Sequence, residues 1–196
     1  MKIKNQKEYF NKNYKQWSKN TPKDKIDIST KIIELIGLKE GESVIDVACG
    51  TGILYYILKD KKLTDYLAID ISEKMLKELQ NIFPDVNTKC LDFDKKVNIN
   101  NKFDYVIIFN GIPHFENIDI AFENVKNTLK PGGKFLIAQT KTRDGIKEHH
   151  RKIGYDLGRE PIPRDNTLKQ LSEKYGFTDI IIKDQEFFYF SCKKKQ

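Results

Sequence analysis

Short apolar runs alternate with amphipathic stretches along most of the chain. The runs typical of buried strands lie near residues 43–47, 66–70, 87–91, 104–109 and 134–139. Helical periodicity lies between them, near residues 53–60, 73–82 and 118–129. Strands and helices that alternate in this way form a parallel sheet covered by helices on both faces.

The last part of the chain has a different pattern. A helical stretch near residues 167–175 is followed by two β-rich runs, 178–183 and 187–192, which only three residues connect. Parallel strands need a much longer connection, so this short link predicts an antiparallel hairpin at one side of the sheet.

The N-terminal stretch predicts one helix near Lys7 to Trp17 and a second near Ser29 to Ile36. Phe10, Tyr14 and Trp17 are spaced i, i+4 and i+7, which places them on one face of a helix while the neighbouring lysines face water. We expect residues 1–40 to form a helical lid that docks on the domain through these aromatic rings. An ordinary docked helix without ligand contact is the alternative.

Composition narrows the class of protein. The 196 residues are close to the size of one α/β domain, so we expect a single domain over 1–196. The net charge of +7 comes from lysines that are spread along the whole chain. This distribution indicates a compositional bias of the sequence rather than a binding surface for nucleic acid. The sequence lacks an apolar stretch of 18 residues and a secretory signal, and its three cysteines form no metal-binding pattern; we therefore expect a cytoplasmic protein with free thiols.

The first predicted strand ends in Asp46-Val-Ala-Cys-Gly-Thr-Gly52, directly before a predicted helix. The glycines permit a positive φ and a close approach of the backbone to a ligand, as in nucleoside-binding loops. A dinucleotide is disfavoured, because Asp46 would repel a pyrophosphate and Tyr55 replaces the third glycine of the dinucleotide fingerprint. A cationic ligand fits better.

S-adenosylmethionine (SAM) has the required polarity, with an ammonium and a sulfonium near this turn. Asp70 ends the next strand, where its carboxylate can accept hydrogen bonds from ribose hydroxyls. Asp92 follows the third strand, where it can accept from the adenine amino group while Phe93 lies against the ring. Three successive strand ends thus carry groups that suit one nucleoside.

With these motifs, and with the later segments 103–110 and 129–137, the sequence resembles the class I SAM-dependent methyltransferases, especially the small-molecule type of ubiquinone and menaquinone biosynthesis. The resemblance implies a Rossmann-like α/β fold with seven strands, mostly parallel, and an antiparallel last strand. It also implies SAM as cofactor, S-adenosylhomocysteine as product, and a set of cofactor-binding positions: Asp46, Ala48, Gly50, Thr51, Gly52, Asp70, Ile71, Met75, Asp92, Phe93 and Asn110.

The segment after the fourth strand, Asn110-Gly-Ile-Pro-His-Phe115, should face the methyl group, because open α/β sheets bind ligands at the carboxyl ends of their strands. The segment does not reproduce the Asn/Asp-Pro-Pro-aromatic motif of enzymes that methylate nucleic-acid amino groups. His114 is a candidate catalytic residue, as a general base or as a group that orients the acceptor. A structural hydrogen bond is the alternative role.

Residues 141–166 are too many for an ordinary connection, and such segments often cover a substrate. We take His150 as a second catalytic candidate, and Tyr14, Trp17, His149 and Tyr155 as candidate substrate contacts. Metal binding is not expected, because adjacent histidines point in different directions in regular structure. A solvated basic helix is the alternative for this segment.

The sequence therefore predicts in-line transfer of a methyl group from SAM to a small-molecule acceptor, without a membrane span. Two alternatives stay open at this point. One is an RNA or protein methyltransferase, and the other is a non-enzymatic SAM-binding protein. The sequence does not define the acceptor or the oligomeric state.

Overall fold

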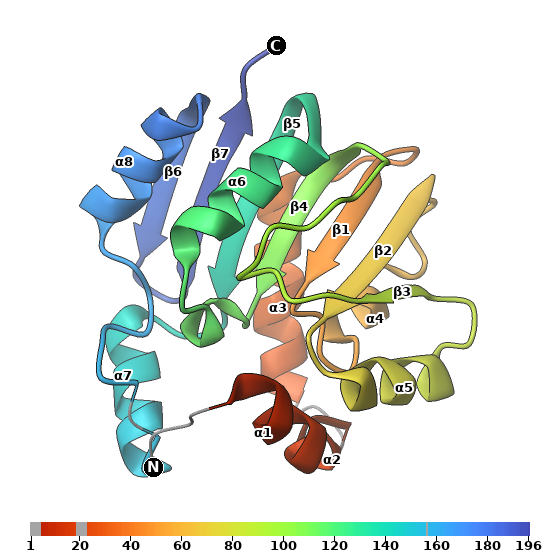
Figure 1. Ribbon diagram of the computed structural model, residues 1–196, viewed down its shortest axis with the longest axis vertical. Helices are drawn as coiled ribbons and strands as arrows, with labels where there is room; N and C mark the ends of the chain where they lie inside the picture. The colour runs from red at the N-terminus through yellow and green to blue at the C-terminus, as the bar shows by residue number, and fades with distance from the viewer. Residues whose placement is uncertain (1–4, 19–22, 156) are drawn as a thin grey trace.

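A computed structural model describes residues 5–18, 23–155 and 157–196. Its described strands form one seven-stranded sheet in the order β3-β2-β1-β4-β5-β7-β6 (Figure 1). The strands are β1 Ser43–Val47, β2 Asp65–Asp70, β3 Asn87–Cys90, β4 Phe103–Phe109, β5 Leu129–Gln139, β6 Phe177–Asp184 and β7 Phe188–Lys194. Strands β1 to β5 pair in parallel, and β7 runs antiparallel to both β5 and β6. The predicted fold class and the terminal hairpin are confirmed.

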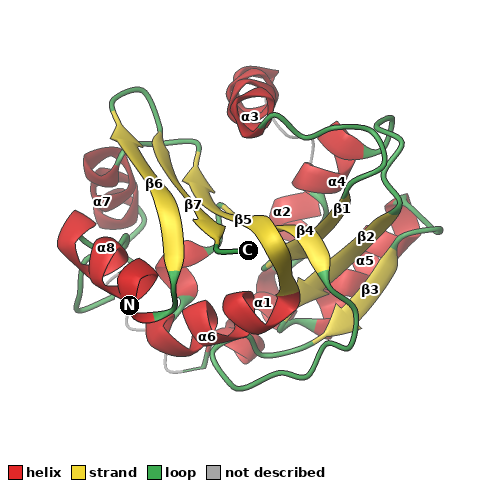
Figure 2. Ribbon diagram, turned by 90° about the horizontal axis from the view of Figure 1, so that it is seen from above, coloured by secondary structure: helices red, strands yellow, loops and turns green. Residues whose placement is uncertain are grey.

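Helices cover both faces of this sheet, as Figure 2 shows. The helices are α1 Gln6–Asn13, α2 Lys15–Ser18, α3 Lys23–Ile36, α4 Ile53–Leu58, α5 Glu73–Ile82, α6 Ile118–Thr128, α7 Arg143–Lys152 and α8 Asp165–Lys174, with a 3-10 turn, η1, over Ile112–His114. Helices α3, α4 and α5 pack on one face, and α6 and α8 pack on the other. Over the ranges that the structure describes, no helix is both long and apolar enough to cross a bilayer.

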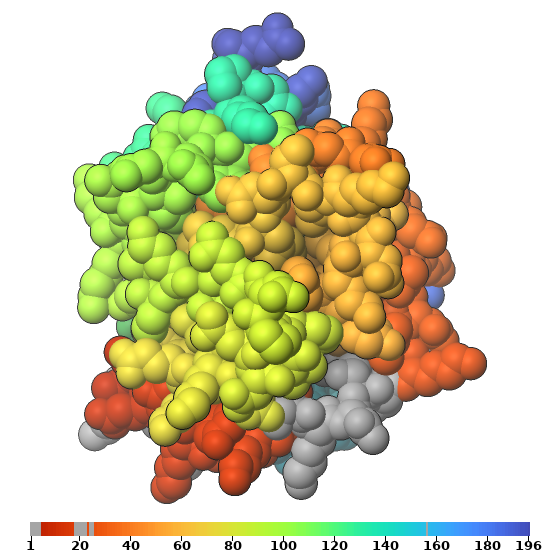
Figure 3. Space-filling model, turned by 90° about the vertical axis from the view of Figure 1, so that its right-hand side faces the viewer, coloured from red at the N-terminus to blue at the C-terminus, as the bar shows by residue number. Residues whose placement is uncertain are grey.

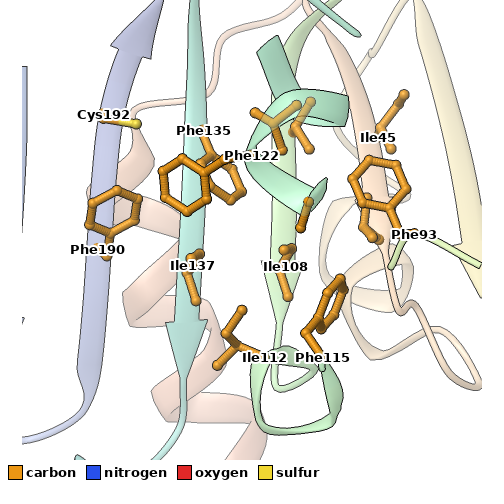
Figure 4. Close-up of a cluster of buried hydrophobic side chains, with 14 of the residues drawn as sticks. Ile45, Phe93, Ile108, Ile112, Phe115, Phe122, Phe135, Ile137, Phe190 and Cys192 are labelled. Atoms are coloured by element: carbon orange, nitrogen blue, oxygen red, sulfur yellow. The ribbon is translucent and has the colours of Figure 1, made fainter. Parts of the chain in front are cut away.

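Each face of the sheet has its own apolar core. Under α6, the ring of Phe122 lies 5.1 Å from that of Phe135, which in turn lies 5.8 Å from the ring of Phe190 (Figure 4). On the other face, side chains such as Leu54 and Leu79 are fully buried against β1 and β2. Each such side chain contributes about 1.5–3 kcal/mol of hydrophobic stabilisation, so the two cores hold the strand ends in a fixed arrangement.

The N-terminal helices divide into two parts with different roles. The predicted helix over 7–17 is interrupted at Tyr14, which ends α1 before α2 begins. Helix α3 packs on the sheet through Ile32, Ile33 and Ile36 and thus belongs to the core. Only α1 and α2 lie over the sheet edge, beside α5, as the red segment at the lower edge of Figure 3 shows. Residues 1–4 and 19–22 of the predicted lid lie outside the described residues.

The parallel strands all end at the lower edge of the sheet in Figure 1, where α1, α2 and α7 also lie. This edge brings together the loop after β1, the ends of β2 and β4, and the two helical segments that the sequence predicts to cover a ligand. The fold thus places every candidate segment on one side of the molecule.

Candidate functional site

The loop after β1 is held in a conformation that few residues adopt. Ala48, Gly50 and Gly52 have φ values of 58°, 55° and 94°, in the left-handed region. A Cβ on Gly52 would lie only 2.2 Å from Cδ1 of Leu79. Glycine is therefore required at this position both for the backbone angle and for the close packing of the loop on α5.

Asp70 fixes this loop to the end of β2. Its Oδ2 accepts a hydrogen bond of 2.9 Å from the Gly50 N–H, and its Oδ1 accepts one of 2.8 Å from the Ser72 N–H. Burial raises the pKa of the Asp70 carboxyl, and the backbone hydrogen bonds from Ser72 and Gly50 oppose that shift. Each carboxylate oxygen keeps a second lone pair, which leaves the capacity to accept hydrogen bonds from a ribose.

Asp46 occupies a different position from the one expected. It is buried behind the loop and does not line the cavity described below, and its Oδ2 accepts a 2.7 Å hydrogen bond from the Tyr66 hydroxyl. Its Oδ1 has no hydrogen-bond partner among the described residues. Burial raises the pKa of Asp46 to about 7. Asp46 thus joins β1 to β2 through Tyr66 directly before the loop.

The ends of β3 and β4 contribute the next two predicted positions. Asp92 lies at the cavity wall and forms a 3.0 Å ion pair with Lys95, and Phe93 is buried in the core while also lining the cavity. Asn110 has a φ of 56°, and its Oδ1 accepts a 2.9 Å hydrogen bond from the Thr140 N–H. This bond ties the end of β4 to the end of β5.

A cavity of about 840 Å³ runs along these strand ends. It is lined by most of the residues predicted from the sequence: Trp17, Ala48, Gly50, Thr51, Gly52, Asp70, Ile71, Met75, Asp92, Phe93, Asn110, His114, His149, His150 and Tyr155. Of the predicted positions, only Asp46 and Tyr14 do not line it. Phe10 and Trp17, the other two members of the predicted aromatic face, both line it.

Helices α1 and α2 close the cavity through specific hydrogen bonds. The Thr51 hydroxyl donates to the carbonyl oxygen of Trp17 at 2.9 Å. The Asn11 Oδ1 accepts from the Ser72 hydroxyl at 2.8 Å and from the Lys74 N–H at 3.2 Å. These bonds link the lid both to the glycine loop and to the first turn of α5.

Aromatic rings enclose the part of the cavity beyond Asn110. The ring of Phe10 lies 4.8 Å from that of His114 in an edge-to-face arrangement, and Tyr9 stacks on Tyr155 at 6.2 Å. The Tyr155 hydroxyl lies 3.1 Å from Nδ1 of His114 and accepts a 3.3 Å hydrogen bond from Nε2 of Gln6. The lid and the segment after α7 therefore meet over His114.

His114 is neutral at physiological pH. Burial lowers its pKa to about 3, and the neighbouring His150 and the positive charge of Arg159 act in the same direction. The Arg159 guanidinium donates to the carbonyl oxygens of Pro113 and Phe115 and so fixes the turn that carries His114. Burial also lowers the pKa of His150. Neither ring is a charged group in the cavity.

Arg143 and the cysteines have structural roles. Arg143 is held by Asp184 at 3.1 Å and by Asp165 at 2.7 Å, which anchors the start of α7. The three cysteines are free, and Cys49, which belongs to the loop itself, is buried, which raises the pKa of its thiol. Within the described ranges, no group of three His, Cys, Asp or Glu side chains is arranged to hold a metal ion.

The sequence did not single out several lining residues, chiefly Gln6, Tyr9, Gln139, Ile146 and Ile153. Tyr9 had a signal, because it adjoins Phe10 in an aromatic-rich helix. Gln6 contacts a residue 149 positions away, and no local pattern predicts such a contact.

The comparisons with known proteins agree with this geometry. Residues 44–133 match the family described as a methyltransferase domain. This match covers the glycine loop, Asp70, Asp92, Asn110 and His114, which are the parts of the site contributed by the sheet. Residues 44–133 thus form a methyltransferase domain, and these matches together support a class I SAM-dependent methyltransferase. SAM is the cofactor of this family.

Two curated methyltransferases illustrate the relationship. Phosphoethanolamine N-methyltransferase 1 of Arabidopsis thaliana is 27% identical over 180 residues, which are 87% of this chain and 36% of that protein. The demethylmenaquinone methyltransferase of Renibacterium salmoninarum is 32% identical over 108 residues, which are 55% of this chain and 45% of that protein. This methyltransferase domain thus spans less than half the length of the curated relatives it matches.

A solved methyltransferase shares the fold. Phosphoethanolamine N-methyltransferase 2 of Haemonchus contortus, in complex with phosphomonomethylethanolamine and S-adenosylhomocysteine, superposes with a TM-score of 0.67 at 20% identity. The superposition covers 85% of this chain and 52% of the nematode chain. At this identity the likeness supports the architecture of the methyltransferase domain and not its acceptor.

Proposed function

We propose that this methyltransferase transfers the methyl group of SAM to a small-molecule acceptor by in-line displacement. The observation that carries the proposal is one cavity that continues from the glycine loop to the aromatic rings around His114. A lid of two short helices closes it by hydrogen bonds to both the loop and α5. Such a space suits a nucleoside and a small acceptor side by side.

The residues present fit SAM. Gly50 and Gly52 line the cavity without a side chain, so the methionine part could approach the backbone of the loop. Asp70 would hold the ribose, Asp92 would accept from the adenine amino group, and Phe93 would lie against the ring. SAM brings the activated methyl group to the reaction, so the protein need mainly align the acceptor and exclude water, which is worth on the order of 7–11 kcal/mol at best.

The aromatic end of the cavity would hold the acceptor. Gln6 donates to the Tyr155 hydroxyl, which leaves the hydroxyl proton available to Nδ1 of His114. This arrangement favours the tautomer of His114 that carries its hydrogen on Nε2. We assign His114 the role of orienting the acceptor, since its low pKa makes it a weak base. His150, His149 and Trp17 complete the walls as part of the same proposal.

An assay with methyl-labelled SAM tests this function. The acceptors are phosphoethanolamine and a demethylmenaquinol, chosen because relatives act on compounds of these names, together with a metabolite panel and an RNA control. Transfer to a metabolite but not to RNA is the expected result. Salt-sensitive transfer to RNA would favour the alternative that the net charge of +7 suggests. SAM binding without transfer to any acceptor would favour a non-enzymatic role.

A cytoplasmic location is also part of the proposal. It rests on the three free cysteines, which suit a reducing compartment, and fractionation of cells that express a tagged protein tests it. Recovery of the tag with the membrane pellet or outside the cell would contradict it.

A further inference from the structure

Gln139 is a buried amide that has an unpaired donor. It is the last residue of β5, only 2% of its surface is exposed, and its Nε2 has no hydrogen-bond partner among the described residues. Buried polar atoms in proteins are nearly always paired, so an exception of this kind calls for an explanation. Gln139 is one of the residues that line the large cavity, and a molecule bound there would supply the missing partner.

The protein neighbours of Gln139 do not complete its hydrogen bonds. Oδ1 of Asn110 already accepts from both the N–H and the hydroxyl of Thr140. On the neighbouring strand β7, the residue in register with Gln139 is Phe188, whose side chain cannot accept a hydrogen bond through a lone pair. A carboxylate that lines the cavity, that of Asp94, accepts from the N–H groups of Glu116 and Asn117 instead.

Strand order places Gln139 at the acceptor end of the site. The groups that suit the cofactor lie at the ends of β3, β2, β1 and β4, which are four successive strands of the sheet. Strand β5 comes next, with Ala138 in register with Phe109 of β4. Gln139 therefore lies one strand beyond the positions that suit SAM, where the acceptor must approach the methyl group.

We propose that Gln139 determines specificity for the acceptor by donating a hydrogen bond from Nε2 to an oxygen atom of that molecule. The inference rests on the proposed function and extends it to the acceptor's chemistry. Rotation about the last torsion of a glutamine side chain is soft, so the amide can turn its unpaired N–H toward the cavity. An ammonium group cannot accept this bond. The matching acceptor carries a hydroxyl, carbonyl, carboxylate or phosphate oxygen near the atom that is methylated.

Stability of the protein without acceptor gives the first test. Methionine has nearly the shape of glutamine and no amide, so Gln139→Met removes the unpaired donor without opening a cavity. We expect its Tm to rise by about 2–4 °C or more, since an unpaired buried donor is destabilising. Gln80→Met, on the exposed surface of α5, is the matched control and should leave Tm unchanged. A lower Tm for Gln139→Met would show that the amide is paired within the protein and would overturn the proposal.

Acceptor kinetics give the second test, with phosphoethanolamine or the demethylmenaquinol as probe, whichever the wild-type protein methylates. We expect Gln139→Met to raise the acceptor KM or lower kcat/KM by at least tenfold, while the Kd for SAM changes less than twofold. An unchanged kcat/KM would overturn the proposal even if Tm rises. If the wild-type protein methylates neither probe, the proposed function fails for these acceptors, and the Tm measurement still decides whether Gln139 has an unpaired donor.

Discussion

The Tyr155 hydroxyl lies 3.1 Å from Nδ1 of His114, although 41 residues separate the two in the sequence. Tyr155 follows α7 and His114 ends the turn after β4, so this contact joins the cover of the cavity to its floor. Burial raises the pKa of the tyrosine and lowers that of the histidine, and both groups are therefore neutral over the physiological range. The pair forms a fixed, uncharged part of the cavity wall.

This pair predicts the effect of removing one oxygen atom. Tyr155→Phe keeps the ring that stacks on Tyr9 but loses the hydrogen bond that orients His114. We expect kcat to fall roughly tenfold, which corresponds to about 1.4 kcal/mol, while SAM affinity stays the same. The measurement is steady-state kinetics beside calorimetry with SAM. Unchanged kcat in a variant that still binds the acceptor would show that the hydroxyl has no role in turnover.

The low pKa of His114 predicts a pH profile. A histidine with an ordinary pKa would change charge near pH 6.5, whereas His114, with a pKa of about 3, stays neutral from pH 5 to pH 8. We therefore expect the pH profile of kcat near pH 6.5 to have the same shape in the wild type and in His114→Gln. A step of that kind in the wild-type profile, absent from the variant, would mean that His114 titrates in the usual range.

The lid contacts differ in strength, and the difference is measurable. Asn11→Ala removes two hydrogen bonds to the start of α5, one of them from the fully buried Ser72, so we expect SAM to dissociate roughly tenfold faster. Lys7→Ala removes an exposed ion pair with Glu73, which should matter less than fivefold. Trp17 is the one tryptophan of the chain, so stopped-flow fluorescence reports the lid directly. Equal effects of the two substitutions would contradict this ranking.

Two glycines with positive φ separate packing from backbone strain. Gly52→Ala combines a φ of 94° with a Cβ 2.2 Å from Leu79, so we expect the free energy of unfolding to fall by roughly 2–5 kcal/mol. Gly37→Ala has a φ of 68° and no atom within 4 Å of the added Cβ, and it should cost only about 1 kcal/mol. Urea denaturation measures both values. Similar losses for the two variants would mean that the loop moves away from Leu79.

Burial of Asp46 makes stability depend on pH. Its pKa rises from 3.8 to about 7, so the folded state keeps a proton that the unfolded chain has lost between pH 4 and pH 7. The contribution of Asp46 to stability therefore decreases as pH rises through that window. Asp46→Asn cannot ionise, and its stability relative to wild type should increase from pH 4 to pH 8 by on the order of 2–4 kcal/mol. A difference that does not change with pH would contradict the raised pKa.

The sheet and the cofactor loop could be predicted because local patterns encode them. For most strand ends, the apolar runs gave the correct position to within one or two residues. Gly50 and Gly52 correctly indicated the turn after the first strand. Parallel strands end at one edge of the sheet. Because Asp70, Asp92 and Asn110 stand at the ends of predicted strands, the sequence predicted that they lie at the same edge, and all three line the cavity. For these residues, the regular alternation of strands and helices along the chain determines where they lie in space.

The other parts of the site depend on contacts that no local pattern carries. The orientation of Asp46 depends on Tyr66, a partner on the neighbouring strand. Tyr14 was predicted to share one aromatic face with Phe10 and Trp17, and only those two line the cavity. The amide of Gln139 is unusual only because its neighbours are already paired or apolar, and this becomes visible once the strands are assembled.

Calorimetric titration with SAM and S-adenosylhomocysteine tests the central claim most directly, with wild type, Asp70→Ala and Asp60→Ala compared. Asp70 accepts one hydrogen bond from the Gly50 N–H of the loop and one from the Ser72 N–H before α5, and it lines the cavity, whereas Asp60 is exposed after α4. The account predicts that wild type and Asp60→Ala bind one molecule of either compound with equal affinity, and that Asp70→Ala binds at least tenfold more weakly. Failure of the wild-type protein to bind either compound, or unchanged affinity in Asp70→Ala, would contradict the assignment of this cavity to SAM.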